Sequence, residues 1–459
     1  MKLSAKNVLV LVVCCLTMCL TGCKKSSTSN YDVSVTVTGL VGTGLVLQLN
    51  NADNLSIYAN GVSTFSGQLL SGYTYAVSIL KNPGLPQQTC TLANASGTVA
   101  SASITNITVT CLPVEFAYVV SSGIQVVAPY VIDQTTGALV SEGAPVSTGN
   151  SPVALAVDST GRYAYAVATD NGVSTVSMYL GNPATGLWLS AGAAVSASPV
   201  ASPDSMGIAV DPGSKYVYVA NSAVNTISGF NINSGTAALT CFGIAGNVCP
   251  SVPAASTGNG PTGLASAQSA GNSYLYATNF SDGNVSQYLI NATNGALTSM
   301  GTAPAGNHPA AIVLSPKIKT SAGTFGPFLF VVNTSDDTVS GYSINAGLLT
   351  STGAATNSGG SAPAAIAVSS TGFAYVVNSG SASIAAYSVS VGGELTSLGA
   401  PVATGNNPVS VSVDPAAKFV YVANQADGTI SIYPINAGGT LGTATTQAVG
   451  SSPVIVLAS

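Results

Sequence analysis

The fold is decided by a stretch near the end of the chain, Gly405-Asn-Asn-Pro-Val-Ser-Val-Ser-Val-Asp-Pro-Ala-Ala-Lys-Phe-Val-Tyr-Val-Ala-Asn-Gln-Ala-Asp-Gly-Thr-Ile-Ser-Ile-Tyr-Pro-Ile435. Apolar residues alternate with other residues in three short runs, which is the pattern of half-buried β-strands. An Asp-Pro turn separates the first two runs, and an Ala-Asp-Gly turn precedes the third. The stretch therefore predicts three consecutive antiparallel strands.

An aromatic pair in the middle run recurs along the last three quarters of the chain. Its seven copies are Phe116/Tyr118, Tyr163/Tyr165, Tyr216/Tyr218, Tyr274/Tyr276, Phe328/Phe330, Phe373/Tyr375 and Phe419/Tyr421. They are spaced by roughly 45 to 58 residues, the period of one propeller blade. Such units cannot bury both faces alone and must stack around an axis. We therefore expect an all-β chain in which residues 112–459 form a seven-bladed β-propeller.

The register of the repeats predicts how the ring closes. Within one blade we name strand A (409–413), strand B (419–423), strand C (430–433) and a variable strand D. The propeller begins at Phe116 with a B strand, whereas the chain ends at 453–457 with an A strand. The last strand should therefore complete the first blade and remove its open edge.

Residues 31–111 carry a different pattern of short strands separated by Gly and Asn turns. The expected strands cover 33–38, 45–49, 55–58, 75–79 and 107–110. Short alternating strands at this spacing predict a small β-sandwich. The segment shows no cluster of ionisable residues, so we interpret it as a spacer or assembly module.

The start of the chain reads as a signal peptide over residues 1–22. Lys2 and Lys6 precede an apolar run over 8–16, and the tetrad Leu20-Thr-Gly-Cys23 follows. This tetrad resembles the lipobox of bacterial lipoproteins. The resemblance implies lipidation of Cys23, a flexible tether over 23–30 and membrane anchoring in the bacterial cell envelope, at the outer membrane. The alternative is an ordinary signal peptide with an incidental cysteine.

Cysteine usage agrees with an envelope location. Four cysteines remain beyond Cys23, and they form two pairs that are local in sequence, Cys90 with Cys111 and Cys241 with Cys249. We predict a disulfide in each pair. A zinc site is disfavoured because the spacing is wider than Cys-x-x-Cys and no histidine is near.

Charge is scarce in this chain. Only 5% of its residues are charged, and the formal net charge is −5. A nucleic-acid binder would need a basic face, so we exclude that class. We expect a monomer whose solubility rests on hydroxyl and amide groups.

The antiparallel order of strands distributes charge unevenly. The A–B and C–D turns should lie on one face of the propeller, here called the A–B face. The B–C turns and D-to-A connections should lie on the opposite face, here called the B–C face. The A–B turns contain Arg162, Lys215, Lys317, Lys319 and Lys418. The B–C face receives Asp170, Asp204, Asp282, Asp336, Asp337, Asp427 and the only histidine, His308. We predict that these seven residues form a ligand-binding face, with His308 near the channel mouth as the one catalytic candidate.

Two further repeats lie on the B–C face. The D-to-A connections contain Gly-Asn-x-Pro at 149, 258, 306 and 405, where glycine is expected to supply unusual dihedral angles. An asparagine ends strand B, at Asn221, Asn279, Asn333, Asn378 and Asn424. We expect these asparagines to cap the B–C turn through bonds to its backbone.

The motif Tyr-Val-Tyr-Val-Ala-Asn at 216–221, repeated as Phe-Val-Tyr-Val-Ala-Asn at 419–424, resembles the YVTN-type repeats of seven-bladed propellers. More distantly it is similar to lactonase-like propellers. Members of that family that hydrolyse sugar lactones carry His and Arg in the connections into the inner strands. The residues after the recurring proline here are Val153, Asp204, Thr262, Ala310, Ala364, Val409 and Val454.

This departure from the lactonase pattern favours a binding or scaffolding disc over an enzyme. The predicted partner is an envelope protein, a neutral glycan or Ca²⁺, and no other cofactor is expected. The alternative is a lactonase-like hydrolase of a sugar lactone, of the 6-phosphogluconolactonase kind. A phosphorylated substrate would require cations, which this face lacks.

Overall fold

The computed structural model describes residues 29–84, 86–170, 173–197, 205–242, 255–321 and 323–459. The predicted signal peptide and nearly all of the predicted tether, Cys23 included, lie outside the described residues. The chain divides into two compact units, one formed by residues up to 84 with 89–112, the other by residues 86–88 and 113–459. Within the described residues the only helical element is one 3-10 turn, η1 (Ser222–Val224). No described helix has the length and apolar character needed to cross a membrane.

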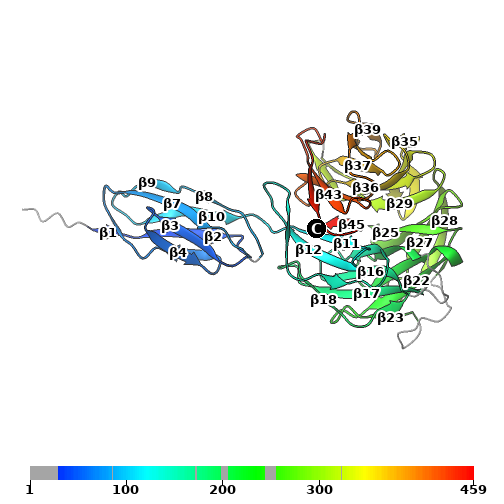
Figure 1. Ribbon diagram of the computed structural model, residues 1–459, viewed down its shortest axis with the longest axis horizontal. Coiled ribbons are helices and arrows are strands. Elements are labelled where there is room, and N and C mark those ends of the chain that lie inside the picture. Colours follow the sequence, from blue (N-terminus) through cyan, green and yellow to red (C-terminus); the bar gives the residue numbers. More distant parts are fainter. Residues whose placement is uncertain (1–28, 85, 171–172, 198–204, 243–254, 322) are drawn as a thin grey trace, which may run out of the picture. The chain divides into compact units, whose positions relative to one another are not determined.

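The first unit is a β-sandwich, as its strand pattern predicts (Figure 1). One sheet has the order β5 (Gly61–Thr64), β2 (Val33–Thr38), β10 (Ile104–Cys111), β8 (Cys90–Ala93). The other has the order β4 (Asp53–Ile57), β3 (Leu45–Leu49), β7 (Thr74–Lys81), β9 (Ser96–Thr98). A short pair joins β1 (Asn30–Tyr31) to β6 (Leu69–Leu70). Alternate apolar residues of both sheets form one core.

A disulfide crosslinks this sandwich where it was predicted. Cys90 and Cys111 face one another in the register of β8 and β10, and their sulfurs are bonded. Cys241 is also disulfide-bonded, but Cys249 lies outside the described residues, so that pairing stays a prediction.

The described part of the second unit contains seven sheets of four or five strands, which confirms the seven-bladed propeller. Blade 1 comprises β45 (Pro453–Ala458), β11 (Phe116–Ser121), β12 (Val126–Ile132), β13 (Leu139–Ser141) and β14 (Val146–Ser147). Blade 2 comprises β15 (Pro152–Val157), β16 (Tyr163–Asp170), β17 (Val173–Gly181), β18 (Trp188–Ser190) and β19 (Val195–Ser196). Blade 3 comprises β20 (Ser205–Val210), β21 (Tyr216–Asn221), β22 (Thr226–Ile232), β23 (Leu239–Cys241) and β24 (Ala255–Ser256). Blade 4 comprises β25 (Pro261–Ser269), β26 (Asn272–Asn279), β27 (Asn284–Ile290) and β28 (Leu297–Pro304).

The remaining blades follow the same order from the inner strand outward. Blade 5 comprises β29 (Pro309–Leu314), β32 (Phe328–Asn333), β33 (Thr338–Asn345), β34 (Leu348–Ser351) and β35 (Thr356–Asn357), with a hairpin of β30 (Ile318–Thr320) and β31 (Gly323–Phe325) in its A–B connection. Blade 6 comprises β36 (Pro363–Val368), β37 (Phe373–Asn378), β38 (Ser383–Val389), β39 (Leu395–Ser397) and β40 (Val402–Ala403). Blade 7 comprises β41 (Pro408–Val413), β42 (Phe419–Asn424), β43 (Thr429–Pro434) and β44 (Thr445–Ala448).

The last strand closes the ring as predicted. β45 pairs antiparallel with β11, with Val119 opposite Val456, so blade 1 combines both ends of the propeller sequence. In Figure 1 the red β45 lies beside the cyan β11. The inner strands also contact one another in sequence around the ring, and β45 touches both β41 and β15.

Tyrosine hydroxyls join each blade to its neighbours and explain the recurring aromatic pair. The second aromatic of strand B donates its O–H to a carbonyl in the C–D turn of the next blade, in the pairs Tyr118–Gly186, Tyr165–Ala237, Tyr218–Gly295, Tyr276–Gly347, Tyr375–Gly439 and Tyr421–Gly137. A tyrosine of strand C bonds back to the preceding blade, in the pairs Tyr179–Ser147, Tyr288–Ser256, Tyr342–Pro304, Tyr387–Asn357 and Tyr433–Ala403. Trp188 of blade 2 stacks on Tyr118 of blade 1, with ring centroids 3.9 Å apart. These aromatic side chains therefore join neighbouring blades.

Candidate functional site

A cavity of about 490 Å³ runs between the inner strands and receives lining residues from all seven blades. Residues at or near the starts of the inner strands form part of its wall, so the cavity opens on the B–C face. Each inner strand pairs with strand B on one side only, so its other edge of backbone N–H and C=O groups faces the channel.

A β-bulge at the start of every inner strand shapes the channel mouth. In five blades one residue is skipped in the pairing with strand B, namely Val153, Ala310, Ala364, Val409 or Val454. In blade 4 Thr262 and Gly263 are skipped. All seven of these residues line the channel. Bulges re-aim side chains and are frequent beside binding sites.

The register of blade 3 corrects one sequence assignment. The residue after the recurring proline in sequence is Asp204, which lies outside the described residues. The pairing of β20 with β21 shifts between Ser205 and Gly207, so Met206 occupies the bulge position that Val153 has in blade 2. Two extra residues separate Pro203 from this bulge, and sequence spacing alone did not reveal that.

The channel wall offers hydrogen bonds but no charge. Its described lining residues include no Asp, Glu, Lys, Arg or His, and the polar side chains are those of Thr262, Ser410 and Gln425. Thr262 Oγ1 donates to the Pro309 carbonyl of the next blade at 3.0 Å. Gln425 Oε1 accepts from Asn407 Nδ2 at 2.8 Å. Such a wall suits an uncharged ligand with several hydroxyl groups.

The Gly-Asn-x-Pro motif forms a clamp with an aspartate of the same blade, here named the Asn–Asp clamp. In each of three blades the asparagine donates its backbone N–H and its side-chain amide to one carboxylate, at 2.6 to 2.9 Å. The pairs are Asn259–Asp282, Asn307–Asp336 and Asn406–Asp427. The backbone bond, followed by the side-chain bond, lowers the pKa of all three carboxyls.

The expected role of glycine is confirmed at Gly149, whose φ is 84°, but the structure corrects it for the three clamp glycines. A Cβ on Gly258, Gly306 or Gly405 would lie 2.6 to 2.7 Å from the clamp carboxylate, so close approach requires glycine. The left-handed conformation belongs to the following x residue, with φ of 55° at His308 and 51° at Asn407.

The asparagines that end strand B are buried rather than capping the turn backbone. Asn221, Asn279, Asn333 and Asn424 are 0% exposed and donate their amides to side chains of strand C. In blade 7, for example, Asn424 Nδ2 bonds Thr429 Oγ1 and Ser431 Oγ. The expectation of a backbone cap on the B–C turn was wrong, because the side chain points across the sheet. Strand C carries two polar residues two positions apart, such as Thr429 and Ser431, and this pair was the sequence signal that could have shown the contact.

Those of the predicted ligand-binding residues that the structure describes lie on the B–C face but do not converge. Asp282, Asp336 and Asp427 occupy clamps in three blades, and Asp337 Oδ1 accepts the Ala362 N–H at 2.7 Å. Asp170 ends β16, and Asp204 lies outside the described residues. No described group of three or more His, Cys, Asp or Glu is arranged to hold a metal ion. A ligand role for these aspartates, including Ca²⁺ binding, stays a prediction.

His308 stands on the rim of the channel. Its Nδ1 lies 2.5 Å from Ser335 Oγ, and its ring stacks on Phe280 of blade 4 with centroids 4.3 Å apart. His308 is exposed and does not line the cavity, but Ala310, two residues later, does. The structure therefore gives it one hydroxyl partner and leaves it facing solvent.

The A–B face carries acids as well as the five predicted cations. Asp133, Asp158, Asp211, Asp414, Glu115 and Glu394 all lie in its turns or beside its strand ends. The asymmetry between faces therefore concerns cations, which within the described propeller are confined to the A–B side.

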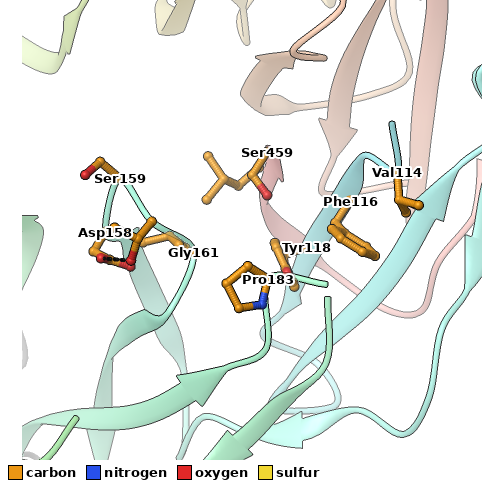
Figure 2. A pocket seen from close by; sticks show the side chains of 11 residues that line it. Val114, Phe116, Tyr118, Asp158, Ser159, Gly161, Pro183 and Ser459 are labelled. Carbon is orange, nitrogen blue, oxygen red and sulfur yellow. Dashed lines mark hydrogen bonds between the residues drawn. The ribbon is translucent and has the colours of Figure 1, made fainter. Parts of the chain in front are cut away.

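A second cavity of about 430 Å³ opens on the A–B face between blades 1 and 2. Figure 2 shows Phe116, Tyr118 and Pro183 along it, with Asp158 and Ser159 at one side. The Asp158 carboxylate is already satisfied, because it accepts bonds from Tyr163 N, Thr160 Oγ1 and Ser214 Oγ. Nothing in this cavity points to a particular ligand.

Seven blades of four or five described strands each, arranged around a channel lined by their inner strands, define a β-propeller whose last strand completes its first blade. The model of the family described as "Lactonase, 7-bladed beta-propeller" matches residues 120–458. The chain belongs to this family. No curated protein is similar to it.

Solved structures of similar fold come from several bacteria. A proposed 6-phosphogluconolactonase from Bacteroides uniformis is 19% identical, with a TM-score of 0.62 over 75% of this chain and 99% of that one. A proposed 6-phosphogluconolactonase from Bacteroides fragilis is 19% identical, with a TM-score of 0.59 over 75% and 98%. A periplasmic gluconolactonase from Pseudomonas aeruginosa is 16% identical, with a TM-score of 0.60 over 74% and 98%. At these identities the likeness establishes the fold.

Proposed function

We propose that the propeller binds and hydrolyses an uncharged sugar lactone at the channel opening on the B–C face. The observation that carries this proposal is the composition of the channel, which presents hydroxyl, amide and backbone groups without a described charge. A volume of about 490 Å³ accommodates a monosaccharide-sized ligand. Family membership supplies the lactone chemistry, and a gluconolactonase is among the proteins of similar fold.

The absence of described cations on this face opposes a phosphorylated substrate. Phosphate is usually held by Arg or Lys through charge-assisted hydrogen bonds. The clamp carboxylates Asp282, Asp336 and Asp427 would repel a phosphate at the rim. We therefore propose a neutral aldonolactone rather than 6-phosphogluconolactone.

His308 is the proposed general base. His308 takes a proton from a water as that water attacks the lactone carbonyl; the bond between the carbonyl carbon and the ring oxygen then breaks, and the ring oxygen takes the proton back from His308 and leaves as an alcohol. Histidine serves this role near neutral pH, and Nε2 of His308 has no partner among the described residues. Ser335 and Phe280 orient the imidazole.

Turnover of δ-gluconolactone, measured above its spontaneous hydrolysis, tests this proposal. His308→Asn should lower turnover at least tenfold. Asparagine occupies the same left-handed position in blade 7, so the backbone should tolerate the change. The matched control is Ser452→Asn, which places asparagine at the equivalent left-handed position of blade 1; it should change turnover less than twofold. Equal rates for wild type and His308→Asn would remove His308 from the mechanism.

A second candidate function is binding without turnover, as the sequence analysis favoured. The lack of an ionisable group among the described channel-lining residues supports it. Saturable binding of the lactone without hydrolysis would select this alternative. Lipidation at Cys23 and an envelope location are proposed from the sequence alone, and fatty-acid labelling that fails in Cys23→Ser would support the anchor.

A further inference from the structure

Two buried acids meet where the ring closes, far in sequence from one another. Glu115 immediately precedes β11 of blade 1 and is 7% exposed, and Asp414 immediately follows β41 of blade 7 and is 2% exposed. Neither lines the channel, and the proposed function uses neither.

The hydrogen bonds of this pair are incomplete for two ionised carboxylates. Asp414 Oδ1 accepts the N–H groups of Lys418 and Phe419, at 2.8 and 2.6 Å. Asp414 Oδ2 and Glu115 Oε2 are buried and have no donor among the described residues. The two side chains lie within hydrogen-bonding reach of each other. Two acceptors in contact can bond only if one carries a proton.

In other blades the aspartate of the same turn has a hydrogen-bond donor for its second carboxylate oxygen. Asp158 of blade 2 stands where Asp414 stands in blade 7, and its Oδ2 accepts the hydroxyl of Ser214 from the next blade. Asp211 of blade 3 receives the Gly213 N–H on Oδ2. At the junction of blades 7 and 1 the next blade offers a carboxyl group in place of a hydroxyl. The residue directly before strand B is Arg162, Lys215 or Lys418 in blades 2, 3 and 7, so an acid is exceptional there.

We propose that Glu115 and Asp414 share one proton and form a pH-sensitive latch between the last and first blades. With the proton present, the two carboxyl groups are joined by a hydrogen bond across the closure. Once it is lost, two buried negative charges face one another at the same junction. The junction between the last and first blades is then weakened by repulsion between the two charges. It is also weakened by the cost of removing both carboxylates from water, which no hydrogen bond offsets.

The groups around the pair set the sign of this dependence. Lys418 Nζ lies 3.5 Å from Gln134 Oε1 and is the cation facing the pair, Asp133 lies in the adjacent C–D turn, and Tyr421 approaches from β42. Burial first, and for Glu115 the neighbouring acid too, raises the pKa of both carboxyls above their ordinary values. The folded state therefore binds more protons than the unfolded chain above about pH 4. The stabilisation is complete below that pH and is lost as pH rises through the folded pKa.

Glu115→Gln tests the latch because an amide donates to Asp414 Oδ2 without a titratable proton. Calorimetry at pH 5 and at pH 8 measures the Tm of the variant minus that of wild type. This difference should be larger at pH 8, by about 2 °C for each pH unit by which the folded pKa is raised. At pH 8 the β45 amides should exchange faster in wild type than in the variant, and at pH 5 equally. Asp211→Asn is the matched control, because it alters the same turn without a facing acid.

Infrared titration of wild type provides a readout that requires no variant to fold. A protonated carboxyl band should persist above the pH range in which ordinary carboxyl groups ionise, and it should disappear as pH rises through the folded pKa. A Tm difference that stays constant between pH 5 and pH 8, together with no such band, would overturn the latch. A rise in wild-type Tm on adding CaCl₂, absent in Glu115→Gln, would place a cation there instead of a proton and would also overturn it.

Discussion

Replacing Tyr218 by phenylalanine tests the inter-blade bonds on which the ring depends. Tyr218 is 0% exposed, and its hydroxyl donates to the Gly295 carbonyl of the next blade at 2.7 Å. Burial raises the pKa of this phenol, so it remains a neutral donor at any working pH. The substitution keeps the ring and removes only the hydrogen bond.

The expected loss is about 1 to 2 kcal/mol, because a buried carbonyl loses its donor while the apolar packing is retained. For a propeller of roughly 350 residues this lowers Tm by about 2 °C. The five equivalent tyrosines of the other blades should each show a loss of this order.

Blade 5 provides an internal comparison. Its corresponding residue is Phe330, and the matching carbonyl, that of Gly393, accepts a bond from Thr352 Oγ1 instead. Thr352→Val should therefore destabilise the protein although it removes no tyrosine hydroxyl. Adding Phe330→Tyr to Thr352→Val should recover part of that loss, because the new hydroxyl reaches the same carbonyl.

Differential scanning calorimetry and urea unfolding with unchanged m-values measure these effects. If Tyr218→Phe and Thr352→Val both stay within about 0.3 kcal/mol of wild type, well below a typical buried hydrogen bond, the inter-blade bonds contribute nothing and the reasoning fails.

Three further changes test other parts of the fold. Gly306→Ala should lower the free energy of unfolding by about 1 to 3 kcal/mol, because the added Cβ opens the Asn–Asp clamp. Gly438→Ala is the control and should be near neutral, because a Cβ there meets nothing within 4 Å. Equal melting temperatures for the two variants would refute the close-approach argument. Val456→Ala, at a position 2% exposed in the closing strand, should cost about 2 kcal/mol in urea unfolding, and a neutral result would mean that β45 carries little of the closure. Replacing Cys90 and Cys111 by serine, 21 residues apart, should lower sandwich stability by about 3 kcal/mol without changing the propeller transition.

The sequence predicted the architecture well because each blade repeats the same solution to the same packing problem. The aromatic pair recurs because every junction needs a ring at this place, and six of the seven described junctions also use its hydroxyl as a donor, as Tyr218 and Tyr421 show. The closure by β45 followed from strand order alone.

The site was less predictable because it depends on register and on contacts between distant turns. Met206, not Asp204, takes the bulge position of blade 3, and only strand pairing reveals this shift. The clamp between Asn307 and Asp336 joins residues 29 apart, so each seemed an independent polar residue in the sequence. The partnership of Glu115 with Asp414 spans nearly the whole propeller and had no local signal.

The most direct measurement is a crystal structure of the propeller soaked with δ-gluconolactone or its hydrolysis product. We predict ligand density in the channel, with hydroxyl groups bonded to Thr262, Ser410, Gln425 and the free edges of the inner strands. An empty channel, with ligand instead in the A–B cavity beside Phe116 and Tyr118 (Figure 2), would contradict the proposed site.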